Sequence, residues 1–204
     1  MSTATITKPA AANAPVFNER GLMDANIPPE AETQRVMMRQ EGQSFAQWME
    51  SRVARRSTRS YDWDALKFQA DYDPKYRRAQ MRYVGTGGTG VNKDTNTVPA
   101  AHFTFSTMVI PAGNIGPSHI HYDVEEIFFV MRGAMKVVCE KDGERWETIV
   151  GERDLISVPP GVYREEHNVG DEDALMCVML GSPKPITPVY PPDSPLTKIK
   201  RDKR

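Results

Sequence analysis

Residues 113–133 read Gly-Asn-Ile-Gly-Pro-Ser-His-Ile-His-Tyr-Asp-Val-Glu-Glu-Ile-Phe-Phe-Val-Met-Arg-Gly, and this stretch decides the fold. Side chains two residues apart in a strand project to the same face, so His119 and His121 can present imidazole nitrogens to one ion. Glu126, five residues later, can complete the set with a carboxylate oxygen. All four histidines of the chain fall within residues 102–167. These residues predict a metal site formed by His119, His121 and Glu126.

The sequence around this stretch has an all-β rhythm, in which short apolar runs alternate with turn residues. Lys141-Asp142-Gly143-Glu144 separates two of the runs, and Asp-Gly favours a type I′ hairpin because both central residues need a positive φ. The predicted strands cover residues of about 102–110, 126–132, 134–140, 145–150, 154–158 and 173–181.

The spacing of the fixed residues resembles the first conserved motif of the cupin superfamily. Gly113, His119, His121, Glu126 and Gly133 are separated by five, one, four and six residues, and every fixed position of that motif is matched. The resemblance covers roughly residues 100–181. It implies an all-β fold, a double-stranded β-helix or cupin jelly-roll barrel, here with an N-terminal helical extension.

The second cupin motif is matched less well. It corresponds to Pro159-Pro160-Gly161-Val162-Tyr163-Arg164-Glu165-Glu166-His167-Asn168, and Arg164 stands where the family has a fourth histidine ligand. An arginine is always protonated and offers no lone pair, so it cannot replace that ligand. Three alternatives follow: the other three ligands suffice, His167 moves in through a bulge to become a ligand, or no metal binds. Strict alternation places His167 on the face opposite to Arg164 and Asn168.

Two histidines and one carboxylate leave open coordination positions, a pattern typical of non-haem Fe(II) sites that activate oxygen. We therefore expect one divalent metal ion per chain as cofactor, Fe(II) first, with Mn, Ni or Zn also suited to these ligands. As catalytic residues we expect Arg164, which would orient a carboxylate or phenolate group, and Glu166, which would pair with Arg164 or act as a base.

The resulting hypothesis is a metal-dependent dioxygenase that acts on a small aromatic or enolisable substrate. One alternative is a lyase or isomerase that uses the ion as a Lewis acid. Another is a non-catalytic cupin that binds a small molecule, which the loss of the fourth histidine favours. Oxygen uptake separates the first two, and metal content separates both from the third.

Composition and pattern divide the rest of the chain. Residues 1–30 are predicted to form a flexible or docked arm, 31–99 a helical extension with lead-in strands, 100–181 the barrel and 182–204 a proline-rich basic tail. In the extension, Ser44 and Gln47 form a capping box for a helix with Phe45, Trp48, Met49 and Val53 on one face, and a shorter helix over Glu32 to Gln40 is expected to end at Gly42. The glycine-rich residues 85–90 lack the lysine of a phosphate loop and are interpreted as a flexible loop.

Composition also limits the partners. The chain has 204 residues, 39% of them hydrophobic, and a net charge of −1, which indicates one core and a small-molecule substrate rather than nucleic acid or a membrane surface. No apolar stretch approaches the roughly 20 residues that span a bilayer, so we expect a cytoplasmic protein. Cys139 and Cys177 are interpreted as reduced buried thiols. Resemblance to cupins, together with the arm and the tail, predicts a homodimer or higher homo-oligomer.

Overall fold

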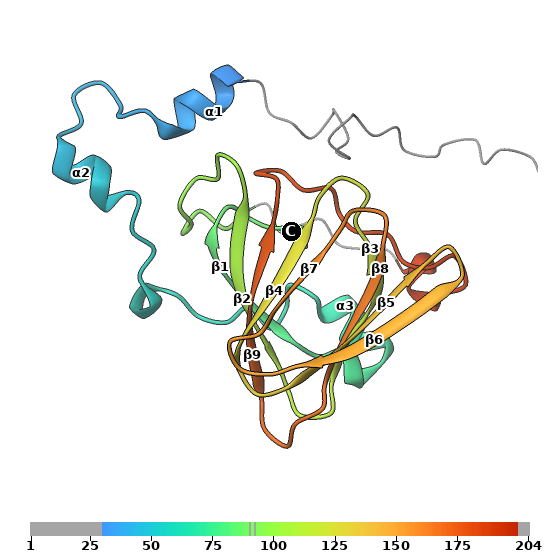
Figure 1. Cartoon of the computed structure of the whole chain (residues 1–204). Coiled ribbons are helices and arrows are strands. Elements are labelled where there is room, and N and C mark those ends of the chain that lie inside the picture. The colour runs from blue at the N-terminus through green and yellow to red at the C-terminus, as the bar shows by residue number, and fades with distance from the viewer. Residues whose placement is uncertain (1–29, 90, 92, 200–204) are drawn as a thin grey trace, which may run out of the picture.

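The computed structural model describes residues 30–89, 91 and 93–199. The expectations for residues 1–29 and for the basic residues 200–204 lie outside this range. Within it, two antiparallel sheets face each other and enclose the core, so the predicted all-β jelly roll with a helical extension is confirmed (Figure 1). No helix in the described ranges is long and apolar enough to cross a membrane.

Nine strands form the barrel, and their order in the sheets is not their order in the chain. The larger sheet has the order β1 (Ala79–Val84), β2 (Thr104–Ile110), β9 (Ala174–Leu180), β4 (Glu126–Arg132) and β7 (Leu155–Val158). The smaller sheet has the order β3 (Ile115–Ile120), β8 (Tyr163–Asn168), β5 (Met135–Lys141) and β6 (Glu144–Val150).

Alternating burial shows why these residues form strands around one core. In β9, every second residue from Ala174 to Leu180 is buried, and in β4 the buried residues are Glu126, Phe128 and Val130. The opposite faces of these strands point outward. The predicted hairpin at Asp142 and Gly143 is confirmed, since both residues have positive φ angles, of 53° and 83°.

The helical extension is present but shorter than predicted. The capping box is confirmed, since the Ser44 hydroxyl accepts a hydrogen bond from Gln47 N at 3.2 Å and the Gln47 side chain accepts one from Ser44 N at 2.8 Å. The helix α2 (Phe45–Glu50) nevertheless buries none of its residues, which leaves its apolar face without the tertiary packing that prolongs a helix. In the part of the chain that the structure describes, the remaining helices are α1 (Glu30–Met37), α3 (Lys67–Tyr72), and the 3₁₀ turns η2 (Arg56–Thr58), η3 (Pro74–Tyr76) and η4 (Pro195–Lys198). The helix α1 ends before the predicted Gln40, and Gly42 has the expected positive φ, 75°, in the turn that follows.

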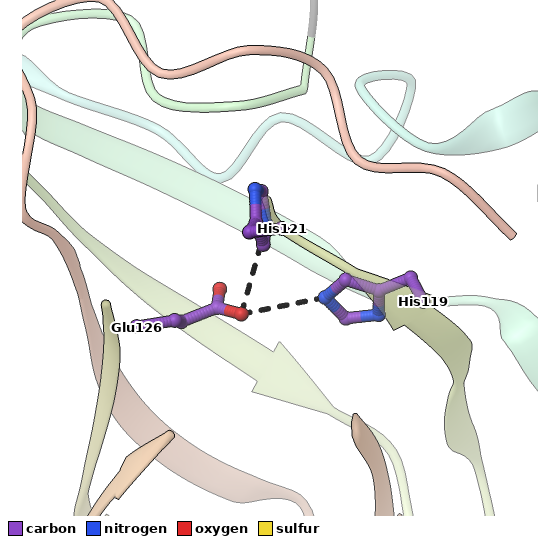
Figure 2. A group of neighbouring side chains, drawn as sticks. All are labelled: His119, His121 and Glu126. Carbon is purple, nitrogen blue, oxygen red and sulfur yellow. Dashed lines mark hydrogen bonds and ion pairs between the residues drawn. The ribbon is translucent and has the colours of Figure 1, made fainter. Parts of the chain in front are cut away.

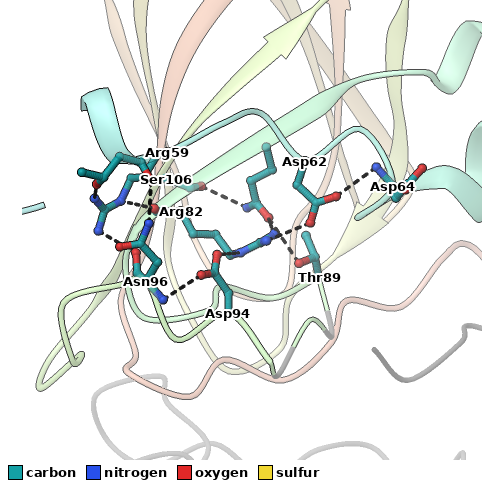
Figure 3. Close-up of polar contacts among 10 residues, drawn as sticks. Arg59, Asp62, Asp64, Arg82, Thr89, Asp94, Asn96 and Ser106 are labelled. Atoms are coloured by element: carbon teal, nitrogen blue, oxygen red, sulfur yellow. Dashed lines mark hydrogen bonds and ion pairs between the residues drawn. The ribbon is translucent and has the colours of Figure 1, made fainter. Parts of the chain in front are cut away.

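An ion-pair network joins the lead-in segment to the barrel (Figure 3). Arg82 of β1 is 7% exposed and lies between two carboxylates, with Nη2 2.8 Å from Asp62 Oδ2 and Nε 2.7 Å from Asp94 Oδ2. Gln80 continues the network, since its side chain accepts from Arg82 Nη1 and donates to Ser106 of β2. The network holds the lead-in segment and the loop with Asp94 against β1.

This network predicts a pH-dependent effect of Asp62→Asn. Burial favours the protonated form of Asp62, but the hydrogen bond and charge of Arg82 outweigh it and lower the pKa of Asp62 below 3.8. A carboxyl group whose pKa is lowered by folding stabilises the native state above its unfolded pKa, and this contribution is lost as the pH falls through the folded pKa. We expect the variant to lose about 1 kcal/mol of unfolding free energy near neutral pH and much less at about pH 3. Urea unfolding at both pH values measures the difference, and an equal loss at both would contradict the role of the charge.

Candidate metal centre

Three buried donor groups converge at the point where β3 ends and β4 begins (Figure 2). His119 lies in β3, His121 follows this strand directly, and Glu126 is the first residue of β4; they are 8%, 2% and 5% exposed. Glu126 Oε2 is 3.4 Å from His119 Nε2 and 3.7 Å from His121 Nε2. The donor atoms of all three residues lie within 4.8 Å of one another. The structure thus brings together the three residues predicted to bind the metal.

The hydrogen bonds of His119 test whether these residues fit a metal ion. Its Nδ1 lies 2.9 Å from the Pro117 carbonyl, which can only accept, so Nδ1 carries the proton and Nε2 directs a lone pair at the Glu126 carboxylate. Two electron-rich atoms at 3.4 Å need a cation or a proton between them. Bonds of about 2.1 Å to one ion place neighbouring donor atoms about 3 Å apart, close to the distances observed. The donor set therefore fits a metal ion.

The protonation states of the donors agree with this fit. Burial lowers the pKa of His121 to about 3, so its imidazole is neutral near pH 7. Burial favours protonation of Glu126, but at the low pH where this carboxyl group titrates the positive charge of His121, together with His119 and Arg164, outweighs that effect and lowers the pKa of Glu126 to about 2, so its carboxylate is ionised near pH 7. A neutral imidazole and an ionised carboxylate are the forms that coordinate a metal.

Asp123 is a buried carboxylate beside His121, a neighbour that the sequence did not indicate. The Nδ1 atom of His121 is buried and makes no hydrogen bond to any described residue, and Asp123 Oδ1 lies 4.0 Å from it. The other carboxylate oxygen of Asp123 accepts a hydrogen bond from Ile186 N at 2.8 Å, which fixes the side chain. Carboxylates in this position commonly hold the ring of a metal-binding histidine. Glu125, which precedes Glu126, is exposed and accepts a hydrogen bond from Ser157, so its carboxylate does not join the three donors.

Arg164 points into the barrel as alternation predicts, but it lies against Glu126. Its side chain is fully buried, with Nε 3.5 Å from Glu126 Oε2 and Nη2 donating to the Pro159 carbonyl at 3.2 Å. Arg164 is not among the residues that line the cavity next to the metal centre. In this position it acts on the charge of Glu126, and the structure does not place it where the predicted substrate clamp would lie.

Glu166 reaches the cavity wall, and a glycine makes room for it. Glu166 is 2% exposed, and burial raises the pKa of its carboxyl group to about 7. Gly116 of β3 is its partner in the ladder, and a Cβ atom at Gly116 would lie 2.1 Å from Glu166 Oε2. A side chain at Gly116 would therefore displace the Glu166 carboxylate.

His167 is not brought to the metal centre. It pairs in register with Ile115 and Lys136, so β8 has no bulge at this position, and the irregularity lies in β3 between Gly116 and His119. Its Nε2 is 2.5 Å from Glu165 on the opposite face from the buried residues Arg164, Glu166 and Asn168. The structure therefore does not match the alternative in which His167 becomes a fourth ligand.

A cavity of about 60 Å³ adjoins the three donors, and much of its wall comes from segments outside the two motifs. The segment before β1 contributes Leu66, Gln69 and Arg78, β1 contributes Gln80, and the tail contributes Pro188 and Tyr190. The glycine-rich loop also borders the site, because a Cβ atom at Gly88 would lie 3.2 Å from His121 Cε1. The apolar part of the wall consists of Leu66, Met108, Phe128, Met176, Val178 and Leu180.

Among the aromatic residues of the barrel, Phe128 lines the cavity, whereas Trp146 is 56% exposed. Tyr122 and Tyr163 are not among the lining residues. The predicted free thiols Cys139 and Cys177 are half-buried rather than fully buried, and burial raises the pKa of both. A role in the metal centre is therefore not indicated for these two residues.

Comparison with known proteins supports the fold. A family model described as a Cupin domain matches residues 106–180. No curated protein matches the chain. Among solved structures, an oxalate oxidase is 18% identical with a TM-score of 0.52, over 80% of this chain and 68% of that one. Peruvianin-I, described as a cysteine peptidase from Thevetia peruviana latex, is 14% identical with a TM-score of 0.53, over 72% and 80%. These two similarities show the fold alone.

A recombinant oxalate oxidase in complex with glycolate is 25% identical with a TM-score of 0.41. This chain spans 46% of its length, and the match covers 44% of this chain.

Proposed function

Residues 106–180 form a cupin domain, and from this premise we propose that the chain is a metal-dependent enzyme, specifically a non-haem iron dioxygenase for a small aromatic or enolisable substrate. The observation that carries the proposal is the set of three buried donors, His119, His121 and Glu126, beside a cavity. Three donors from one side leave other coordination positions open to a substrate and to oxygen. Bound Fe(II) would supply the electrons that activate O₂.

The chain's own residues would prepare the site for this chemistry. His119 and His121 would hold the ion as neutral ligands, and Arg164 would keep Glu126 ionised through its charge. The apolar residues of the wall exclude water, which strengthens each electrostatic interaction inside the cavity. The cavity volume of about 60 Å³ favours the smaller substrates of the proposed class.

Glu166 is the residue best placed to move a proton. It lines the cavity, its Oε1 atom is buried without a hydrogen-bond partner among the described residues, and its pKa of about 7 suits proton exchange near neutral pH. We propose that Glu166 removes a proton from an enolisable carbon or hydroxyl of the substrate. The same position would serve the alternative function, an isomerase or lyase in which the ion acts as a Lewis acid alone.

Oxygen uptake by the reconstituted protein tests the proposal. Metal-free protein loaded with Fe(II) or with Zn(II) is incubated with small aromatic and enolisable compounds while dissolved O₂ is recorded. We expect substrate-dependent O₂ consumption with Fe(II) and none with Zn(II), because Zn(II) has no redox chemistry. Turnover with Zn(II) in the absence of O₂ would favour the Lewis-acid alternative. Ligand binding without turnover under any condition would favour a binding protein.

The partners and the cytoplasmic location expected from the sequence remain proposals. For self-association, the outer face of the larger sheet is the surface of interest, because Phe129, Met131 and Leu155 there are 36%, 48% and 56% exposed. Phe129 and Leu155 are directly paired across β4 and β7. A homodimer through this face stays a prediction.

A further inference from the structure

Arg78 is a buried cation that the two sequence motifs do not include. It precedes β1, is 5% exposed and lines the cavity beside the metal centre. Its Nη1 atom donates to the Tyr76 carbonyl at 3.2 Å, whereas Nε is buried and has no hydrogen-bond partner in the part of the chain that the structure describes. A buried guanidinium donor without an acceptor is costly because its lost hydrogen bond to water is not replaced, so such a group usually has a partner or a ligand.

Two buried acceptor atoms that also lack a hydrogen-bond partner among the described residues belong to side chains lining the same cavity. Oε1 of Glu166 and Oε1 of Gln69 are buried and lack a hydrogen-bond partner among the described residues. A Cβ atom built on Gly116 would lie 2.1 Å from Glu166 Oε2 and 3.6 Å from Arg78 Nε, so both groups approach the same point of β3. Arg78 and Glu166 attract each other electrostatically, but within the described residues neither Arg78 Nε nor Glu166 Oε1 takes part in a hydrogen bond. The cavity therefore offers one charged donor and two acceptors, all unsatisfied.

We propose that Arg78 binds the carboxylate of the substrate, and that the substrate is a small organic acid. This inference rests on the proposed function only in taking this cavity as the substrate site. A planar guanidinium binds a carboxylate through charge-assisted hydrogen bonds, which are the strongest available in a dry cavity. The free oxygens of Gln69 and Glu166 would accept hydrogen bonds from a hydroxyl or enol group of the same molecule.

The net charge of the site, once a metal ion is bound, also favours a negatively charged substrate. Arg78 and Arg164 are buried near three carboxylates, Glu126, Glu166 and Asp123, so with all carboxyl groups ionised these side chains carry one negative charge more than positive. The donor set fits a divalent cation, and its binding would leave an excess of positive charge in a buried site. Because an uncompensated charge is expensive to bury, an anionic ligand would relieve this excess.

Calorimetric titration of the full-length protein tests the inference without relying on turnover. Acetate, lactate, pyruvate and benzoate are each compared with their uncharged amides, on metal-free and on Zn(II)-loaded protein. We expect at least one carboxylate to bind, and its amide to bind at least about 10-fold more weakly, since one charge-assisted hydrogen bond corresponds to about 1.5–3 kcal/mol. Binding to neither form of the protein, or equal binding of acids and amides, would overturn the inference.

Variants at Arg78 identify the residue responsible. Arg78→Met removes the charge at similar length, and we expect carboxylate affinity to fall by about 10- to 100-fold. Arg78→Lys keeps the charge without the planar fork and should bind with intermediate affinity, which also provides a second variant if Arg78→Met does not fold. Arg77→Met is the matched control, because Arg77 is exposed and its Cζ atom lies 4.3 Å from the centre of the Trp63 ring, outside the cavity lining. Unchanged affinity in a folded Arg78 variant, or an equal loss in Arg77→Met, would refute the role of Arg78.

The outcomes separate this inference from the proposed function. Carboxylate binding that depends on Arg78, without O₂ uptake under any condition, would support the inference and contradict the dioxygenase. Iron-dependent O₂ uptake with an uncharged substrate, unaffected in Arg78→Met, would support the dioxygenase and contradict the inference.

Discussion

The variant His121→Ala is expected to lose the bound metal ion. Wild-type protein reconstituted with Fe(II) should hold about one ion per chain, measured by plasma mass spectrometry after removal of free metal. Loss of a residue that only orients a ligand already lowers metal affinity about 10- to 100-fold, so loss of one of three ligands should lower it further. Among the described residues the donor group holds one other histidine, His119, which is already a ligand, so no histidine is left to replace His121.

Three further variants make this result specific. His119→Ala and Glu126→Gln should also lose the ion, because each removes a donor of the same group. His167→Ala is the matched control, since His167 lies on the outer face of β8 beside Glu165, and the ion should be retained. Retention of metal in folded His121→Ala, or its loss in His167→Ala, would show that the ion is bound elsewhere.

The local part of the fold could be predicted from the sequence. The period of two in β4 and β9 reflects one face against the core, and the Asp-Gly turn sets the β5–β6 hairpin through its positive φ angles. The convergence of His119, His121 and Glu126 could also be predicted, because the three residues fall within one stretch of eight residues and flank the same bend. Each of these features depends on neighbours in the sequence.

The rest of the site depends on contacts that sequence periodicity does not encode. Arg78 reaches the cavity because it precedes β1, which pairs with β2. Gln69 of α3 reaches it because its side-chain amide donates a hydrogen bond to the Tyr190 hydroxyl of the tail. Alternation gave the correct side for Arg164, but it does not distinguish a residue on the cavity wall from one packed behind a ligand. The arginine that faces the cavity is therefore Arg78, which precedes both motifs.

Asn168→Ala is expected to lower the unfolding free energy by about 3 kcal/mol. Asn168 is 3% exposed, and its side chain makes three hydrogen bonds at the end of β8. Nδ2 donates to the Ile110 carbonyl at 2.8 Å and to the Glu172 carbonyl at 2.7 Å, and Oδ1 accepts from Gly170 N at 2.9 Å. Alanine would leave three backbone groups unpaired, at about 1 kcal/mol each. Urea unfolding of metal-free protein measures the loss without a contribution from metal binding.

The matched control is Asn114→Ala, which removes a single exposed hydrogen bond to the Arg77 carbonyl and should lose less than about 1 kcal/mol. Equal losses in the two variants would contradict the structural role of Asn168. Because Asn168 links β8 of the smaller sheet to Ile110 of the larger sheet, its contribution is to hold the two sheets together. It lies four residues beyond Arg164, the ladder partner of His119, so folded Asn168→Ala protein should still bind about one ion per chain. The second motif would thus contribute its asparagine to the stability of the barrel, while the first motif supplies the metal donors.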